Sequence, residues 1–292
     1  MRTVAAAVLA LAAMPGALQA QYKVDEKRTA SPDGVVSIEN AAGSIRVIGW
    51  SRSEVAVTGT LGPGAEGLSF SGGPKRTQIE VETERDPNGV SSDLEIHVPG
   101  GSRVEINTFG ANISVSEVTG PVSAEGVNSS IVVTGSPREV SAQTVNGSVD
   151  VTGPAARVHA ETVNGSVTVK GASGVVEANT VNGRLSVIGG TFERGSLEAV
   201  AGSVRFEGTL ARGAEVAAQT VSGSVEFVLP AAVSANFSIT TFSGDVQNEF
   251  GPAARRVSKY TTEKELQFST GNGDAQVSIQ TLSGSITLHR RP

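Results

Sequence analysis

One nine-residue motif occurs three times, with small variations, in the middle of the chain, as QTVNGSVDV, ETVNGSVTV and NTVNGRLSV. The glycine of each TVNG unit follows the previous one after 18 residues, at Gly147, Gly165 and Gly183. Weaker copies extend this series of anchor positions to Ala111, Ser129, Gly202, Gly223, Gly244 and Gly284. A period of about 20 residues with strand-like content is typical of a solenoid, a rod of coils that each pack only on their neighbours.

Apolar residues recur two and four positions after each anchor, with mostly polar residues between them. The column two residues after the anchor contains Ile113, Ile131, Val149, Val167, Leu185, Val204 and Val225. This alternation predicts a strand with one buried face, and a second strand with the same pattern precedes each anchor. Stacking at a strand spacing of about 4.8 Å would place like side chains over one another. The sequence therefore predicts an all-β fold, a single-chain β-solenoid (β-helix) with coils of about 18–21 residues.

An Asn-Gly pair marks the expected corner between the two strands of a coil. Glycine and asparagine tolerate the positive φ of a sharp turn better than other residues do. We therefore expect tight turns at Gly147, Gly165 and Gly183. The preceding side chains would stack as a ladder of amides, formed by Asn128, Asn146, Asn164 and Asn182. We interpret this ladder as structural.

The chain ends differ from the middle. Residues 1–20 have one basic residue, a short apolar run and small residues before Gln21, which predicts a secretory signal peptide. Residues 21–100 are expected to form an irregular N-terminal cap with the first coil, continuous with the repeats of residues 101–292. The step between Gly244 and Gly284 doubles to 40 residues, which predicts a distorted coil or a projecting loop there.

Composition and charge exclude several classes of chemistry and of partner. The chain has no cysteine, which excludes disulfides, cysteine-ligated metals and a lipid-bearing cysteine. Its net charge is −6 and its basic residues are scattered, so nucleic acid is not an expected partner. No segment after the signal peptide approaches the ~18 apolar residues of a transmembrane anchor. We expect export to the periplasm, the cell surface or the medium.

Catalytic chemistry is not indicated. The three histidines, His97, His159 and His289, share no spacing suited to one metal. Glu125 and Glu161 fall in one column but two coils apart, a poor arrangement for a paired-carboxylate mechanism. We predict no catalytic, cofactor-binding or metal-binding residues and no cofactor. A polysaccharide-active β-helix enzyme is the disfavoured alternative.

Four segments taken in order resemble the bacterial DUF4097 family, a group described as candidate adhesins with a β-strand repeat. They are ENAAGSIRVIGWSRSEVAVTG, DLEIHVPGGSRVEINTFGANISV, the serial TVNGSV units and SIQTLSGSITL. The resemblance covers nearly the whole mature chain and implies an exported all-β repeat protein without known catalytic residues.

The leading interpretation is an exported, non-catalytic cell-envelope or surface protein. It would act as an adhesin or scaffold that binds a glycan, matrix or envelope protein through repeated polar faces, because weak contacts sum along a rod. The alternative is an envelope-stress regulatory protein that acts through one protein partner, with its contact patch in residues 60–92 or 250–270.

Overall fold

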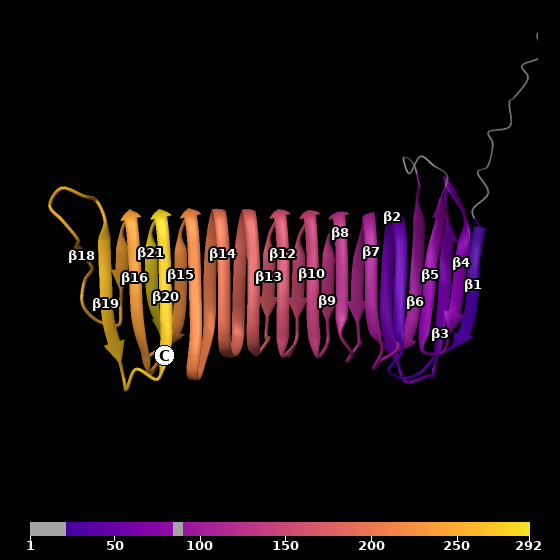
Figure 1. Cartoon of the computed structure of the whole chain (residues 1–292), viewed down its shortest axis with the longest axis horizontal. Helices are drawn as coiled ribbons and strands as arrows, with labels where there is room; N and C mark the ends of the chain where they lie inside the picture. The colour runs from indigo at the N-terminus through magenta and orange to yellow at the C-terminus, as the bar shows by residue number, and fades with distance from the viewer. Residues whose placement is uncertain (1–21, 84–89) are drawn as a thin grey trace, which may run out of the picture.

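The computed structural model describes residues 22–83 and 90–292, so the expected signal peptide, residues 1–20, lies outside the described part of the chain. The described residues form strands that lie side by side along one elongated rod (Figure 1). The all-β solenoid predicted from the 18-residue period is confirmed.

Each central coil contributes one strand to each of two parallel ladders. The first ladder contains β8 (Val122–Asn128), β10 (Glu139–Asn146) and β12 (Arg157–Asn164). The second contains β9 (Ile131–Thr134), β11 (Val149–Thr152) and β13 (Val167–Lys170). The long strand β14 (Gly174–Ser222) passes through successive coils and continues both ladders.

The core lies between the two ladders. Val149 pairs with Ile131 on one side and with Val167 on the other, and all three are buried. The same buried column contains Ile113, Leu185, Val204 and Val225. Burying one such side chain contributes about 1.5–3 kcal/mol before the ordering entropy is subtracted, so repetition is what makes the coils stable. Where the coils lengthen, phenylalanines from successive coils fill the interior with tilted rings, and the ring of Phe206 is centred 5.2 Å from that of Phe192 and 5.0 Å from that of Phe227.

Close packing between coils explains the anchor glycines. A Cβ added at Gly165 would lie 2.0 Å from the carbonyl oxygen of Gly147, although the φ of Gly165 lies outside the left-handed region. Asn146 and Asn164 end strands, and within the described ranges Glu117 is the only non-glycine residue with a positive φ. Gly147 and Gly183 have the positive φ that we expected at the corner, 146° and 158°, whereas the asparagines do not. The neighbouring coil in addition excludes a side chain at the anchor position whatever the turn conformation.

The threonine of each TVNG unit faces inward. Thr162 is 1% exposed and donates its hydroxyl to the carbonyl oxygen of Gly147 at 2.9 Å. Thr144 donates in the same way to Ser129 at 2.9 Å. Each threonine thus fixes the corner of the preceding coil. Because strands alternate, the valine that follows the threonine must point outward.

The C-terminal coils do not stack in chain order. The strands concerned are β15 (Val225–Pro230), β16 (Ala235–Ser243), β17 (Val246–Asn248), β18 (Arg255–Arg256), β19 (Lys264–Thr270), β20 (Ala275–Ser283) and β21 (Ile286–Arg291). Strand β20 lies between β14 and β16 (Figure 1). Strand β21 pairs with β15 on one side and with β17 on the other.

The anchor series predicted that the coils of Gly223, Gly244 and Gly284 follow one another in chain order, and this was wrong, because the coil of Gly284 lies between the other two. After β15 the chain leaves one coil position open and forms β16 and β17. It then reverses through β18 and β19 and returns as β20 and β21, which fill the open position. Strand β19 runs antiparallel to β16 and pairs with its outer edge. An exposed strand edge invites pairing with other chains, and this antiparallel strand covers it.

The N-terminal end is built on the same plan. Its strands are β1 (Tyr22–Thr29), β2 (Val35–Trp50), β3 (Glu54–Leu61), β4 (Ala65–Gly73), β5 (Arg76–Thr83), β6 (Ser92–Pro99) and β7 (Arg103–Ser116). Strand β2 pairs in parallel with β7 on one side and with β5 and β6 on the other. The outer strands β1, β3 and β4 are antiparallel and close this end.

Candidate functional site

An exposed line of apolar side chains runs along the outer surface of the first ladder. It occupies the position between the inward threonine and the asparagine of each TVNG unit. In spatial order this apolar line consists of Ala41, Phe109, Val127, Val145, Val163, Val181, Val200, Val221, Leu282 and Phe242. Val145, Val200, Leu282 and Phe242 are exposed to 40%, 46%, 54% and 53%.

The apolar line gives the outer face of the first ladder a different character from the one that the sequence predicted. From the sequence we expected regular polar faces, and this face is apolar along its length. A contiguous exposed apolar surface of several hundred Å² or more on a soluble protein marks a site of interaction. The sequence signal was the first residue of each VNG or VSG triplet, where valine recurs although the strand alternation points it away from the core.

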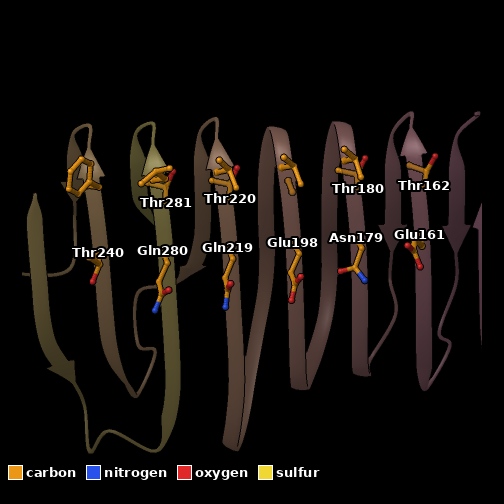
Figure 2. Close-up of a pocket in the computed structure, with 16 residues that line it drawn as sticks. Glu161, Thr162, Asn179, Thr180, Glu198, Gln219, Thr220, Thr240, Gln280 and Thr281 are labelled. Carbon is orange, nitrogen blue, oxygen red and sulfur yellow. The ribbon is translucent and has the colours of Figure 1, made fainter. Parts of the chain in front are cut away.

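Two hollows lie along the apolar line. The larger has a volume of about 640 Å³ and extends from the coil of Glu161 to the coil of Thr240 (Figure 2). The smaller has a volume of about 400 Å³ and lies among the N-terminal coils, beside Glu39 and Phe109. Both are lined by members of the apolar line and by polar side chains two residues earlier in each strand.

These polar side chains form a second outward row. In spatial order this polar row consists of Glu80, Glu39, Asn107, Glu125, Gln143, Glu161, Asn179, Glu198, Gln219, Gln280 and Thr240. Figure 2 shows its C-terminal part, with Gln280 between Gln219 and Thr240. We call the apolar line and the polar row together the groove face.

The groove face is acidic. Glu39, Glu125, Glu161 and Glu198 occupy every second coil, which places them about 9.6 Å apart at the usual strand spacing. Neither lysine nor arginine occurs in the polar row. Over residues 22–83 and 90–292, these four glutamates form no salt bridge with lysine or arginine; Glu161 lies 3.8 Å from the Nε2 atom of His159. Four carboxylates thus face solvent beside an apolar surface.

The predicted asparagine ladder borders the apolar line on its other side. Asn146 Nδ2 donates to Asn128 Oδ1 at 2.9 Å, Asn164 donates to Asn146 at 3.0 Å, and Asn182 donates to Asn164 at 3.0 Å. The amides bond to one another, coil to coil, and remain exposed. Behind them the anchor glycines, Gly147, Gly165 and Gly183, pack on the preceding coils. The ladder therefore sets the edge of the groove face.

The histidines lie apart along the rod. His97 is on β6, with its ring centroid 4.9 Å from that of Trp50, His159 is on β12, and His289 is on β21. His159 Nδ1 lies 3.2 Å from Glu177. Among the described residues no group of three or more His, Cys, Asp or Glu side chains has the geometry of a metal site. The same residues include no helix long and apolar enough to cross a membrane.

Comparisons with known proteins place this chain beside one family and several solved structures. The model of the Toastrack DUF4097 family matches residues 75–289, whereas no curated protein sequence matches. A solved structure from Parabacteroides distasonis, described as a putative adhesin, aligns with a TM-score of 0.41 at 12% identity and covers 91% of this chain and 97% of that chain. A second protein from that organism, described as a putative lipid binding protein, aligns with a TM-score of 0.39 at 12% identity, covering 91% of this chain and 96% of that one. Likenesses this distant carry no argument about function.

Proposed function

This chain belongs to the Toastrack DUF4097 family, as its motifs predicted, and we propose that it is an exported, non-catalytic binding protein of the cell envelope or surface. Its groove face holds an elongated partner, and the rod serves as an adhesin or scaffold. The observation that carries this proposal is the apolar line, which continues from the N-terminal coils to Phe242 without a charged member.

The surface chemistry of the groove face supports binding without turnover. Glu39 and Glu80 lie in adjacent strands, whereas Glu125 and Glu161 are separated by Gln143, and all four stand in one line. Carboxylates that cleave a glycosidic bond flank the bond from two sides. A single line of carboxylates on a flat ladder instead suits recognition of a charged partner along the rod.

A regulatory role through one protein partner is the second candidate. It is supported by the segment between β17 and β19, where Val257 and Tyr260 are 53% and 84% exposed beside Arg255 and Arg256. This segment lies within the 250–270 region that the sequence suggested for a contact patch. Apolar side chains on an exposed basic loop are suited to one local contact.

Binding by purified mature protein to immobilised cell-envelope, matrix and glycan fractions tests the proposal. The double variant Val200→Ser and Val221→Ser should bind at least tenfold more weakly, whereas Val132→Ser on the second ladder should bind like the wild type. Val132 is a matched control because it is 37% exposed and lies outside the groove face.

A shortened rod separates the two candidates. Deletion of residues 147–182 removes two coils in register, and an adhesin or scaffold should lose affinity in proportion. Unchanged binding by this deletion variant, with loss on substitution of Val257 and Tyr260, would favour the regulatory role. Protease treatment of intact cells reports whether the protein is exported and exposed.

A further inference from the structure

We propose that the partner held on the groove face is an amphipathic α-helix of another protein, with lysine or arginine along one flank of its apolar seam. This inference rests on the proposed binding function and adds the chemical class of the partner. It follows from three properties of the groove face, namely the spacing of its apolar line, the spacing of its carboxylates and its lack of basic residues.

The spacing of the apolar line fits a helix. The line presents one side chain per coil, at about 4.8 Å. The seam of an amphipathic helix presents an apolar side chain every 3.5 residues on average, or about 5.3 Å. An extended peptide presents side chains on one face only every ~6.6 Å. Such a peptide also finds no free strand edge here, because the strands of the first ladder pair with neighbours on both sides.

The spacing of the carboxylates fits the same helix. The glutamates in alternate coils are about 9.6 Å apart, and residues seven apart on a helix are about 10.5 Å apart. Basic residues at a heptad spacing would therefore reach Glu161 and Glu198 while the seam covers Val181 and Val200. A neutral partner would bury these carboxylates without counter-charges, which costs free energy. Charge-assisted hydrogen bonds from a basic flank offset that cost.

The length of the larger hollow indicates the length of the helix that would fill it. The hollow covers the six coils from Glu161 to Thr240, which span about 24 Å at the usual spacing. A helix of about 16 residues has that length. Leu282 and Phe242, the largest side chains at this end of the apolar line, would contact one end of the helix.

Other partners fit less well. The carboxylate of a fatty acid and the phosphate of a phospholipid carry negative charge, and the polar row offers them glutamates and no lysine or arginine. Sugar rings stack best on aromatic side chains, whereas the apolar line is aliphatic between Phe109 and Phe242. A second copy of the chain would bring a second acidic row to the same interface.

Fluorescence anisotropy with a labelled synthetic peptide tests the inference. The probe is an 18-residue helix with a leucine seam and lysines on one flank, and its charge-reversed counterpart carries glutamates. The mature protein should bind the lysine peptide at least tenfold more tightly than the glutamate peptide. Val200→Ser with Val221→Ser should weaken binding at least tenfold, and Val132→Ser should change it less than twofold. Serine is used because added aspartate would itself attract the probe.

Substitution of the carboxylates tests the charge argument separately. Glu161→Gln with Glu198→Gln should weaken binding of the lysine peptide several-fold and reduce its salt dependence. Circular dichroism melts confirm that every variant folds. Equal binding of both peptides, or undiminished binding by the valine double variant, would overturn the helix inference.

Two further probes separate failure of this inference from failure of the proposed function. If oleate or phosphatidylcholine vesicles bind and the valine double variant abolishes their binding, the groove face binds lipid and the helix inference is overturned. If sedimentation shows that the wild type is a dimer and that the valine double variant is a monomer, the groove face mediates self-association and the helix inference is overturned. If neither these probes nor the envelope, matrix and glycan fractions depend on Val200 and Val221, the proposed function also fails.

Discussion

Gly284 packs against the carbonyl oxygen of Gly223, and Gly244, which precedes it in the chain, packs in turn against the carbonyl oxygen of Gly284. A Cβ would lie 1.8 Å from the first oxygen and 1.9 Å from the second. The last coil of the chain is thus inserted between two coils that precede it. This insertion places Leu282 between Val221 and Phe242 and makes the apolar line continuous.

Removal of the inserted coil should loosen the C-terminal end of the rod. In a variant that ends at Asp274, β16 and β17 lose their parallel partners β20 and β21. Because each coil is stabilised by its nearest neighbours, hydrogen exchange at residues 235–248 should become fast, while exchange at residues 103–200 stays slow. Protection retained at 235–248 would mean that this coil can dock directly on β14 and β15.

A side chain at an anchor position should destabilise the rod. Gly165→Ala places a Cβ 2.0 Å from the carbonyl oxygen of Gly147, and overpacking of this kind costs about 1–3 kcal/mol. Gly73→Ala is the control, because no atom lies within 4 Å of the added Cβ. The free energy of unfolding in urea should fall for Gly165→Ala alone, and equal values for the two variants would refute steric packing as the reason for the glycine.

Each asparagine of the ladder should contribute to the free energy of unfolding in proportion to the number of hydrogen bonds that it forms. Asn164 donates to Asn146 and accepts from Asn182, whereas Asn128 only accepts. Asn164→Ala should therefore lose about one hydrogen bond more than Asn128→Ala, a difference near 0.5–1 kcal/mol for exposed groups. Urea unfolding of both variants measures it, and a larger loss for Asn128→Ala would contradict the ladder.

Acid should loosen the end of β21. The backbone N–H of Arg290 donates to Glu249 at 2.8 Å, and this bond, with a second from His289, holds the pKa of Glu249 below its ordinary value. A lowered folded-state pKa stabilises the fold above the unfolded pKa, so this stabilisation should disappear as the pH falls below about 4.3 and through the folded-state pKa.

Amide protection at β21 measured between pH 6 and pH 3 checks this expectation. Glu249→Gln should remove most of the pH dependence there. Asp245, whose pKa is also lowered by a hydrogen bond from Lys264, should account for what remains. An unchanged pH profile in Glu249→Gln would show that this carboxyl does not stabilise the terminal coil.

The sequence was sufficient for the architecture because the repeat is periodic. Val149 and Val167 lie in adjacent coils, as the 18-residue step requires. The insertion of β20 could not be predicted from the repeat, because Val277 matches Val216 and Phe237 equally well by pattern. It pairs with both because the position between β14 and β16 is left open when the chain forms β16.

The groove face was missed for a related reason. Val149 belongs to an inward column that the alternation predicts, whereas Val145 has the same residue type but an outward position. Its exposure becomes evident once Thr144 is placed inside by its hydrogen bond to Ser129. The regular spacing of the glutamates likewise becomes visible only when the spatial order of the coils is known, since Glu39 is next to Asn107 in space but not in sequence.

The order of the coils along the groove face is open to one direct measurement. The chain has no cysteine, so pairs of nitroxide labels can be placed at Val145 and Leu282 and at Val145 and Phe242. At the usual strand spacing, five coil steps give about 24 Å for the first pair and six steps give about 29 Å for the second. Double electron–electron resonance should therefore report the shorter distance for Leu282. A shorter distance for Phe242 would mean that the coils stack in chain order and that the continuous apolar line does not exist.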